Sequence, residues 1–196
     1  KKNTNPGVMY MIFDGQQRLP ALSNFAMIKK FLKTDIVYCI LVNFQLAEIG
    51  PIIADLKSNG RKVLVHIDMI KGLSPDEYGA IHLIQNYRVD GIISIKPKVV
   101  AVCKKRNVIA MQRIFLKDSI SLTRSLDVIA KTKPDCLEIL PAVSTSIIQY
   151  IKDELHCEVF SGGLISSEEQ IEACLQAGAI GITVSNPDLW QNKTNS

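Results

Sequence analysis

The sequence predicts an α/β fold, a compact parallel (β/α)8 barrel of the TIM type. First, short and mostly apolar runs alternate with helical patterns along the whole chain. Second, several of these runs lack a clean period-two alternation, which is typical of parallel strands covered by helices. Third, three similar junctions precede strands, at residues 59–62, 88–91 and 176–179. Repeated β/α units imply a parallel sheet with right-handed crossovers, and eight strands favour closure into a barrel.

Eight strands are expected from the apolar runs. In chain order they are Leu19–Leu22, Ile36–Val42, Lys62–Ile67, Gly91–Ile95, Ile109–Ile114, Cys136–Leu140, Glu158–Phe160 and Gly181–Val184. The alternative arrangement is an open, doubly wound sheet. That fold would need a nucleotide-binding loop at its switch point, and the sequence contains neither a GxGxxG pattern nor a P-loop lysine.

Helical segments are expected between the strands. Gln45–Lys57 carries apolar residues at helical spacing. Ser74 is expected to cap the next helix, with Pro75 in its first turn and Glu77 completing a capping box. Ser166–Glu169 repeats this pattern before a later helix. These starts and the intervening strands predict seven helices, followed by a final stub.

Glycines and the last residues define where elements end. Gly60 and Gly178 follow helices, where a left-handed residue is favoured. The final helix is expected to be barely one turn, near Pro187–Gln191. We expect one domain over residues 1–196, with the barrel at residues 8–191 and short flexible tails.

Composition is typical of a cytoplasmic globular protein. Hydrophobic residues make up 47% and charged residues 21% of the 196 residues, enough for a large core. No apolar run reaches the ~18–20 residues that a membrane helix needs. The five cysteines are odd in number and form no CxxC motif, so we expect reduced core residues. The net charge of +4 permits an anionic ligand or RNA but requires neither.

Polar residues follow the third and fourth expected strands, at the end where barrels bind ligands. His66 and Asp68 are predicted to share one face, plausibly the barrel interior. They would contact a ligand, act as acid or base, or form a structural hydrogen bond at the barrel mouth. Lys96 could hold an anion, form a Schiff base in an enzyme, or be solvated. The remaining histidines form no metal-binding cluster with His66, so no metal is expected.

The fifth and sixth strands each carry a charged residue in an apolar context. Arg113 is the best side-chain candidate for carboxylate or phosphate recognition. It could instead pair internally with Glu138, and both roles are compatible. Glu138 is costly to bury unless paired, and it could position Arg113, accept hydroxyl hydrogen bonds or act as a base.

The seventh and eighth strands lead into candidate phosphate-binding loops. Gly162 and Gly163 would let the backbone approach an anion. Ser185 and Asn186 precede Pro187, and Asn186 is expected to cap the final short helix. Many barrels hold phosphate at the loops after strands seven and eight. Two tight turns without a ligand are the simpler alternative.

Several segments together resemble the glycerol-3-phosphate-responsive antiterminator family, the regulators of glycerol uptake operons. The resemblance runs from about Leu19 to Trp190. The segments are His66–Ser74, Asp76–Tyr78, Asp90–Ser94, Gln112–Phe115, Asp118–Ser119, Glu138–Pro141, Ser161–Ile165 and Ser185–Trp190. The sequence departs from the family pattern at Ala142, Ile95 and Ser161, which leaves ligand affinity and specificity open.

The resemblance implies a bacterial cytosolic regulator without catalysis or cofactor. It would sense glycerol 3-phosphate and act on leader mRNA to prevent premature transcription termination. The phosphate would lie on Gly162, Gly163, Ser185 and Asn186. Arg113, Lys96 or Lys71 would add charge, and Asp68 or Glu138 would take the hydroxyls.

The RNA surface, the oligomeric state and other functions stay open at this point. Lys104–Arg106 and Lys29–Lys33 are candidate basic patches, although solvated helix faces explain each alone. A homodimer is an open alternative to a monomer. The other functional hypotheses are a barrel enzyme, such as an isomerase, epimerase or aldolase on a small phosphorylated substrate, and a barrel acting through a protein partner. In the last case Trp190 would anchor an interface, or more ordinarily plug the barrel bottom.

Overall fold

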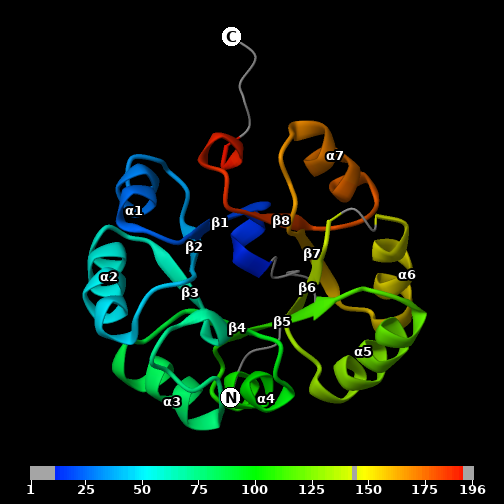
Figure 1. The fold of residues 1–196 in the computed structure, drawn as a ribbon, viewed down its shortest axis with the longest axis horizontal. Coiled ribbons are helices and arrows are strands. Elements are labelled where there is room, and N and C mark those ends of the chain that lie inside the picture. The colour runs from blue at the N-terminus through cyan, green and yellow to red at the C-terminus, as the bar shows by residue number, and fades with distance from the viewer. Residues whose placement is uncertain (1–11, 143–144, 192–196) are drawn as a thin grey trace, which may run out of the picture.

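The computed structural model describes residues 12–142 and 145–191, which form a closed, all-parallel barrel of eight strands (Figure 1). Each strand pairs with the next, and β1 closes the ring by pairing with β8. The strands are β1 (Arg18–Leu22), β2 (Tyr38–Leu41), β3 (Lys62–His66), β4 (Gly91–Ser94), β5 (Ile109–Phe115), β6 (Cys136–Leu140), β7 (Glu158–Gly162) and β8 (Gly181–Val184). The predicted barrel is confirmed, and the open doubly wound sheet is excluded.

A ring of helices surrounds the barrel (Figure 1). The α-helices are α1 (Phe25–Phe31), α2 (Leu46–Ser58), α3 (Glu77–Asn86), α4 (Pro97–Lys105), α5 (Ser119–Thr132), α6 (Thr145–Leu155) and α7 (Glu168–Gln176). Three short 3-10 helices are η1 (Ile12–Gly15), η2 (Ile67–Met69) and η3 (Pro187–Leu189). The seven helices and the final stub of one turn agree with the prediction over the described residues. The first four residues of the predicted barrel range, 8–11, lie outside them.

Two helix starts differ from the sequence prediction. The cap of α3 is Asp76, whose side chain accepts a hydrogen bond from the Gly79 amide at 2.9 Å. Ser74 does not cap it, because the Ser74 carbonyl accepts from the Asp76 amide in a preceding turn. In α7 the cap is Ser167, and Gln170 completes the capping box. A serine-led capping box is therefore present before α7, one residue later than Ser166 and Glu169 would have placed it.

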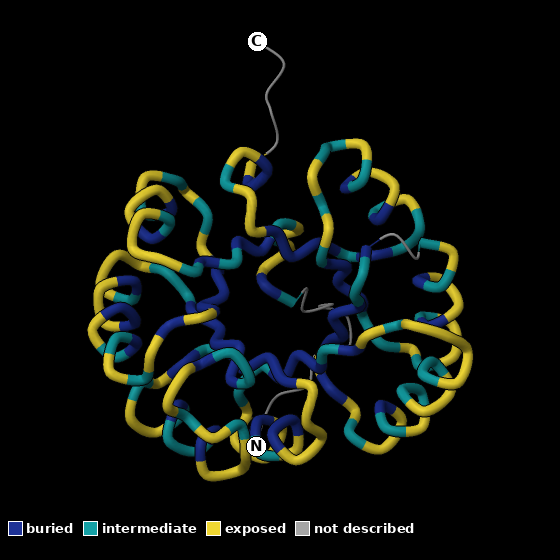
Figure 2. The backbone as a smooth tube through the Cα atoms, in the orientation of Figure 1, coloured by how far each residue is buried: buried dark blue, intermediate teal, exposed yellow. Residues whose placement is uncertain are grey.

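The core side chains form two clusters separated by the strand backbones. Figure 2 shows the ring of strands largely buried. Side chains pointing inward fill the barrel, among them Leu19, Ile40, Leu64, Met111 and Phe160. The alternate residues point outward and pack beneath the helices in a larger cluster. Consequently the strands are apolar on both faces, and their sequences lack period-two alternation.

The N-terminal end of the barrel is closed by η1, which Figure 1 shows inside the ring of strands. Phe13 is 2% exposed and packs edge to face against Tyr38 and Phe160, with ring centroids 5.2 Å apart in each pair. This plug was not predicted, because an isolated Phe in a short apolar run carries no periodic signal.

Trp190 neither plugs the barrel nor anchors an exposed interface. It is 3% exposed, packs edge to face on Phe31 of α1, and donates its indole N–H to the Val184 carbonyl at 3.3 Å. Because η3 is a single turn, Trp190 supplies packing against α1 that a full eighth helix would otherwise give. In the part of the chain that the structure describes, no helix is long and apolar enough to cross a membrane.

All five cysteines are free thiols. Four are buried, and Cys157 is partly buried. Burial raises the pKa of the Cys103 thiol to about 12 and that of Cys157 to about 11. Both thiols are therefore protonated near neutral pH and poorly reactive, in agreement with the prediction of reduced core residues.

Candidate functional site

A layer of polar side chains lies above the apolar filling of the barrel, towards the C-terminal ends of the strands. Leu64, Met111 and Cys136 belong to the inner apolar cluster. The residues two positions later on the same strands point inward one layer higher. They are His66 on β3, Arg113 on β5 and Glu138 on β6, and Thr183 on β8 joins them. We call His66, Arg113, Glu138 and Thr183 the polar layer.

Glu138 is the centre of this layer. Its side chain is fully buried and accepts two hydrogen bonds from Arg113, at 2.5 Å from Nε and 3.1 Å from Nη2. The Thr183 hydroxyl donates a third at 2.6 Å. A buried carboxylate is tolerated when it is paired and hydrogen-bonded in this way. The internal ion pair considered for Arg113 is therefore present.

His66 is buried but lacks hydrogen-bond partners. It is 2% exposed, and neither ring nitrogen makes a hydrogen bond within the described residues. Burial, helped by the positive charge of Arg113, lowers the pKa of His66 to about 3. The ring is therefore neutral near pH 7, and its approach to Asp68, at 3.5 Å from Nδ1 to Oδ2, is not an ion pair.

Asp68 lies beside His66, but for a different reason from the one predicted. β3 ends at His66, and Asp68 belongs to the 3-10 turn η2, so strand alternation does not place it. Its Oδ2 accepts a hydrogen bond from the Ile95 amide at 3.2 Å, whereas its buried Oδ1 has no partner among the described residues. Buried polar atoms are nearly always satisfied. The unpartnered atoms of His66 and Asp68 therefore mark a place where a ligand or water would bind.

Gly162 is the last residue of β7, paired with Thr183, rather than the start of the following loop. A Cβ at this position would lie 2.1 Å from the Thr183 hydroxyl oxygen and 3.2 Å from Oε1 of Glu138. Only glycine therefore leaves room for the polar layer. Gly163 has a φ of +74°, which a residue with a side chain adopts at a cost.

The other predicted site residues lie at the rim, outside the polar layer. Lys71, Lys96, Ser185 and Asn186 are exposed. The backbone of Lys71 forms hydrogen bonds with the loop after β2 at the rim of the barrel. Asn186 caps η3 as expected, accepting a hydrogen bond from the Asp188 amide at 3.1 Å. The structure thus separates the predicted residues into a buried group and a rim.

Two residues near the site were not predicted. Thr183 lies in an apolar run, where a threonine is ordinary strand composition. In the structure a Cβ at Gly181 would lie 2.4 Å from the inward ring of Phe160, and Thr183, two residues later, points inward as well. Met69 places its sulfur 3.8 Å from Nη1 of Arg113, and nothing in the sequence indicates that contact.

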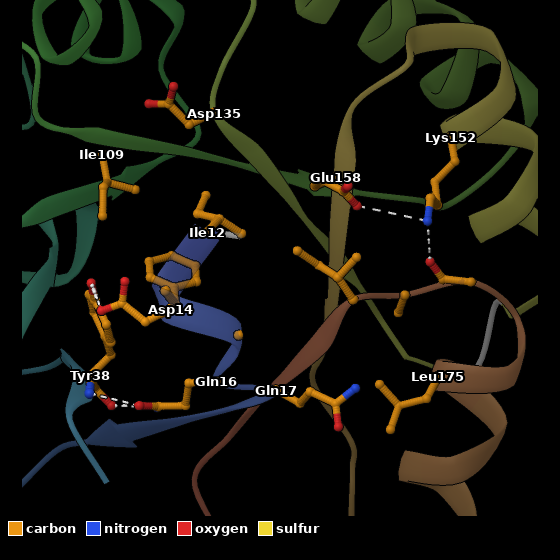
Figure 3. Close-up of a pocket in the computed structure, with 15 residues that line it drawn as sticks. Ile12, Asp14, Gln16, Gln17, Tyr38, Ile109, Asp135, Lys152, Glu158 and Leu175 are labelled. Carbon is orange, nitrogen blue, oxygen red and sulfur yellow. Dashed lines mark hydrogen bonds and ion pairs between the residues drawn. The ribbon is translucent and has the colours of Figure 1, made fainter. Parts of the chain in front are cut away.

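A hollow lies at the opposite, N-terminal end of the barrel (Figure 3). It has a volume of about 790 Å³, and its charged lining residues are Asp14, Asp135, Glu158 and Lys152. Figure 3 shows Lys152 directed to Glu158 and to a backbone carbonyl. This carbonyl belongs to Gly178 and accepts a hydrogen bond from Nζ of Lys152 at 2.8 Å. Each of these carboxylates has a lysine beside it, Lys62 for Asp14, Lys104 for Asp135 and Lys152 for Glu158, so these lysines are already engaged and are not free to bind an anion. No group of three or more potential metal ligands occurs among the described residues.

Comparison with known proteins identifies the family. The family model for the glycerol-3-phosphate responsive antiterminator matches residues 19–190. A glycerol uptake operon antiterminator regulatory protein from Listeria monocytogenes is 32% identical, with 93% of this chain and 98% of that chain covered and a TM-score of 0.89. A glycerol uptake operon antiterminator-related protein from Thermotoga maritima is 26% identical, with 89% and 98% covered and a TM-score of 0.78.

A more distant solved structure shows the fold alone. Orotidine 5'-phosphate decarboxylase from Pyrococcus horikoshii is 18% identical, with 86% of this chain and 88% of that chain covered and a TM-score of 0.64. Enzymes therefore share this barrel, and fold does not decide function. The family match spans nearly the whole barrel, from β1 to Trp190, and includes the polar layer and its rim. On this ground the chain belongs to the glycerol-3-phosphate responsive antiterminator family.

Proposed function

We propose that this protein binds glycerol 3-phosphate at the polar layer and, in response, binds the leader mRNA of glycerol uptake genes to prevent premature termination. The observation that carries the proposal is the set of buried polar atoms without partners, on His66 and Asp68, beside the Glu138–Arg113 ion pair. The proposed RNA partner would place the protein in the cytoplasm, and the proposal needs no cofactor.

The effector has two kinds of polar group, and the site offers a match for each. Its hydroxyls would bond to the free atoms of Asp68 and His66, and to the remaining acceptor capacity of Glu138. Its phosphate would bind Arg113 and the backbone at Gly162 and Gly163.

At the rim, four further residues would complete the effector site. Ser185 and Asn186 would contribute backbone contacts to the phosphate. Lys96 and Lys71 are exposed and would add positive charge at the entrance.

The barrel enzyme is the alternative, and the chemistry of the layer favours the regulator. A general base works best with a pKa near the operating pH. The low pKa of His66 makes it a weak base at neutral pH. Glu138 already accepts three hydrogen bonds, from Arg113 and Thr183. Both residues are thus suited to binding hydroxyls or positioning a cation rather than to moving protons.

Calorimetric titration with glycerol 3-phosphate tests the effector proposal, with glycerol and inorganic phosphate as controls. Asp68→Asn should weaken binding about 10-fold or more, because an amide replaces an acceptor-only group. Asp14→Asn, at the opposite end of the barrel, is the matched control and should bind as the wild type does. Failure of folded wild-type protein to bind, or a continuing heat of turnover, would contradict the proposal.

The regulatory step requires the effector to change the affinity for RNA. A ligand shifts a regulator only by binding one of its states better. RNA binding should therefore be stronger with glycerol 3-phosphate than without it, in filter binding with a leader transcript of a glycerol uptake operon. Equal affinity under both conditions would contradict sensing. Sedimentation in the same conditions would decide between the monomer and the homodimer.

A further inference from the structure

The charge of the chain is concentrated in one segment. Residues 96–133 contain ten lysines and arginines against two aspartates, a net charge of +8. Because the whole chain carries +4, the remaining residues together carry −4. The mild net charge therefore hides a strongly basic region within an otherwise acidic protein. Such asymmetry is typical of a surface that binds a polyanion.

This segment is one continuous sector of the barrel. It comprises α4, β5 and α5, and Figure 1 shows the two helices side by side at the edge of the ring. Within it, Arg113 is paired with Glu138, Lys104 with Asp135, and Lys98 lies 4.0 Å from Glu77. The other cations are exposed and form no ion pair within the described residues: Lys96, Lys105, Arg106, Lys117, Arg124, Lys131 and Lys133.

A groove opens in this sector near the barrel mouth. Its volume is about 340 Å³, and its lining includes Ile95, Pro97, Arg113, Phe115 and Arg124. Ile95 is 45% exposed and Phe115 is 48% exposed, although each lies at the end of a strand. Phe115 thus lies beside Arg124, a cation that forms no ion pair within the described residues. An exposed aromatic ring beside such a cation is the combination that binds single-stranded nucleic acid, because bases stack on the ring and phosphates contact the cation.

We propose that this groove binds unpaired nucleotides of the leader RNA. Phe115 stacks with a base, and Arg124 contacts the phosphates together with Lys96 and Lys117. The remaining exposed cations of α4 and α5 extend the contact along the RNA backbone. This inference rests on the proposed function and locates the surface that serves it.

The groove is joined to the proposed effector site by two hydrogen-bonded contacts. The amide of Ile95 donates to Asp68 at 3.2 Å. Arg113, which lines the groove, is held by Glu138 in the polar layer. An effector that binds Asp68 and Arg113 therefore contacts the residues that position Ile95 and the inner end of the groove. This arrangement links effector binding to the shape of the RNA surface through adjacent residues.

The other basic patch fits RNA less well. Lys29, Lys30 and Lys33 belong to α1 or follow it, on another side of the ring (Figure 1). Lys30 lies 3.5 Å from Asp188. Phe25, the exposed aromatic residue of α1, already packs edge to face on Phe44. This patch is therefore the natural control for the groove.

The experiment compares matched variants with one RNA. The probe is labelled single-stranded RNA, enriched from a random pool by the wild-type protein with glycerol 3-phosphate present. Phe115→Ala and Arg124→Ala should each weaken RNA binding about 10-fold or more, which is 1.4 kcal/mol or more. Phe25→Ala and Lys33→Ala are the aromatic and cationic controls and should bind as the wild type does. All four should retain glycerol 3-phosphate binding by calorimetry.

Two further readouts separate the phosphate contact from the stacking contact. The slope of log Kd against log salt should fall by about 0.7 for Arg124→Ala and stay unchanged for Phe115→Ala. Ultraviolet cross-linking of RNA to unaltered protein should label the peptide that contains Phe115.

Failure of this inference differs from failure of the proposed function. If the wild type enriches no RNA, the RNA step of the proposed function is wrong. If it binds RNA and both groove variants bind equally well, the groove is not the RNA surface, and a protein becomes its candidate occupant. Loss of RNA binding in Lys33→Ala alone would instead assign the RNA to the basic patch of Lys29, Lys30 and Lys33.

Discussion

At the N-terminal end of the barrel the interior is closed by the aromatic ring of Phe13, whereas at the C-terminal end it is closed by an ion pair and a neutral histidine. At the edge of the N-terminal end, Asp14, Tyr38 and Lys62 satisfy one another, while the buried Oε2 of Glu158 accepts no hydrogen bond and lies 3.8 Å from Nζ of Lys152. Lys62 donates to Asp14 at 2.9 Å and to Tyr38 at 2.8 Å, and the Tyr38 hydroxyl donates to Asp14 at 3.0 Å.

At the C-terminal end the polar side chains lie deeper inside the barrel, and some of their atoms lack hydrogen-bond partners. His66 and Asp68 retain buried atoms without partners, and burying such atoms costs about 1–3 kcal/mol each in mutational studies. An apolar plug like Phe13 would avoid that cost. This departure from ideal packing at the C-terminal end is of the kind usually found at functional sites, and it supports the effector site proposed there.

The largest change in stability is expected at Glu138, which forms the buried ion pair at the C-terminal end. Glu138→Ala should lower the free energy of unfolding by about 3–5 kcal/mol, because Arg113 is left largely buried without its counter-charge. Urea unfolding measures this loss. Glu138→Leu combined with Arg113→Met should recover most of the stability while glycerol 3-phosphate binding stays absent. Recovery of binding in the double variant would show that the ion pair has only a structural role.

The aromatic plug should affect stability alone. Phe13→Ala should reduce the free energy of unfolding. The loss should lie in the lower part of the range of about 3–5 kcal/mol, because the plug lies at an open end where neighbours can partly fill the space. Its affinity for glycerol 3-phosphate, measured by calorimetry, should equal that of the wild type. A loss of affinity without unfolding would mean that the two ends are coupled.

Acid should destabilise the C-terminal end through His66. The pKa of His66 is about 3 when folded against 6.5 in its ordinary state. Below pH 6.5 the unfolded chain therefore binds a proton that the folded protein excludes, and stability falls as the pH is lowered towards 3. At about pH 5 this amounts to about 2 kcal/mol. Above pH 6.5 the effect is absent.

The measurement for His66 is a difference between two proteins. The free energy of unfolding, determined in urea at about pH 7.5 and pH 5, should fall further in the wild type than in His66→Gln, which lacks the titrating ring. Equal slopes for the two proteins would mean that His66 has an ordinary pKa and is not buried in the way described.

A smaller effect on stability is expected at two glycines with left-handed backbone conformations, which lie at opposite ends of the barrel. Gly60, before β3, has a φ of +74° and open space around it, and Gly163, after β7, has the same φ. Gly60→Ala should cost about 1–2 kcal/mol of stability, and Gly163→Ala should cost more, because its Cβ would also lie 3.1 Å from Cδ2 of Leu140. Only Gly163→Ala should also weaken glycerol 3-phosphate binding in calorimetry. Equal affinities in both variants would remove the Gly163 backbone from the proposed phosphate site.

The sequence predicted the strands well because their apolar runs are local. The bounds of β6 and β8 agree with the prediction at both ends. The bounds of other strands differ from the prediction where a tertiary contact determines the end of the strand. β7 extends to Gly162 because that residue pairs with Thr183, and β3 stops at His66 because η2 turns the chain there.

The candidate site was predicted only in part. His66, Asp68, Arg113 and Glu138 stood out because a polar residue in an apolar strand is unusual. Their arrangement depends on residues far apart in the chain. Arg113 and Glu138 are 25 residues apart, and Glu138 and Thr183 are 45 apart. Sequence periodicity identifies the face of a residue on its own strand, but it does not identify the side chain opposite.

The order of the elements, the parallel barrel and the concentration of positive charge in residues 96–133 were therefore determined by the sequence itself. Hydrophobic patterning and charge are properties of short segments and can be read without the fold. The tertiary structure alone decided that Glu138 holds Arg113, that His66 is neutral and unpartnered, and that Phe13 fills the opposite end. Those features arise from closure of the barrel, which removes water and brings distant strands into contact.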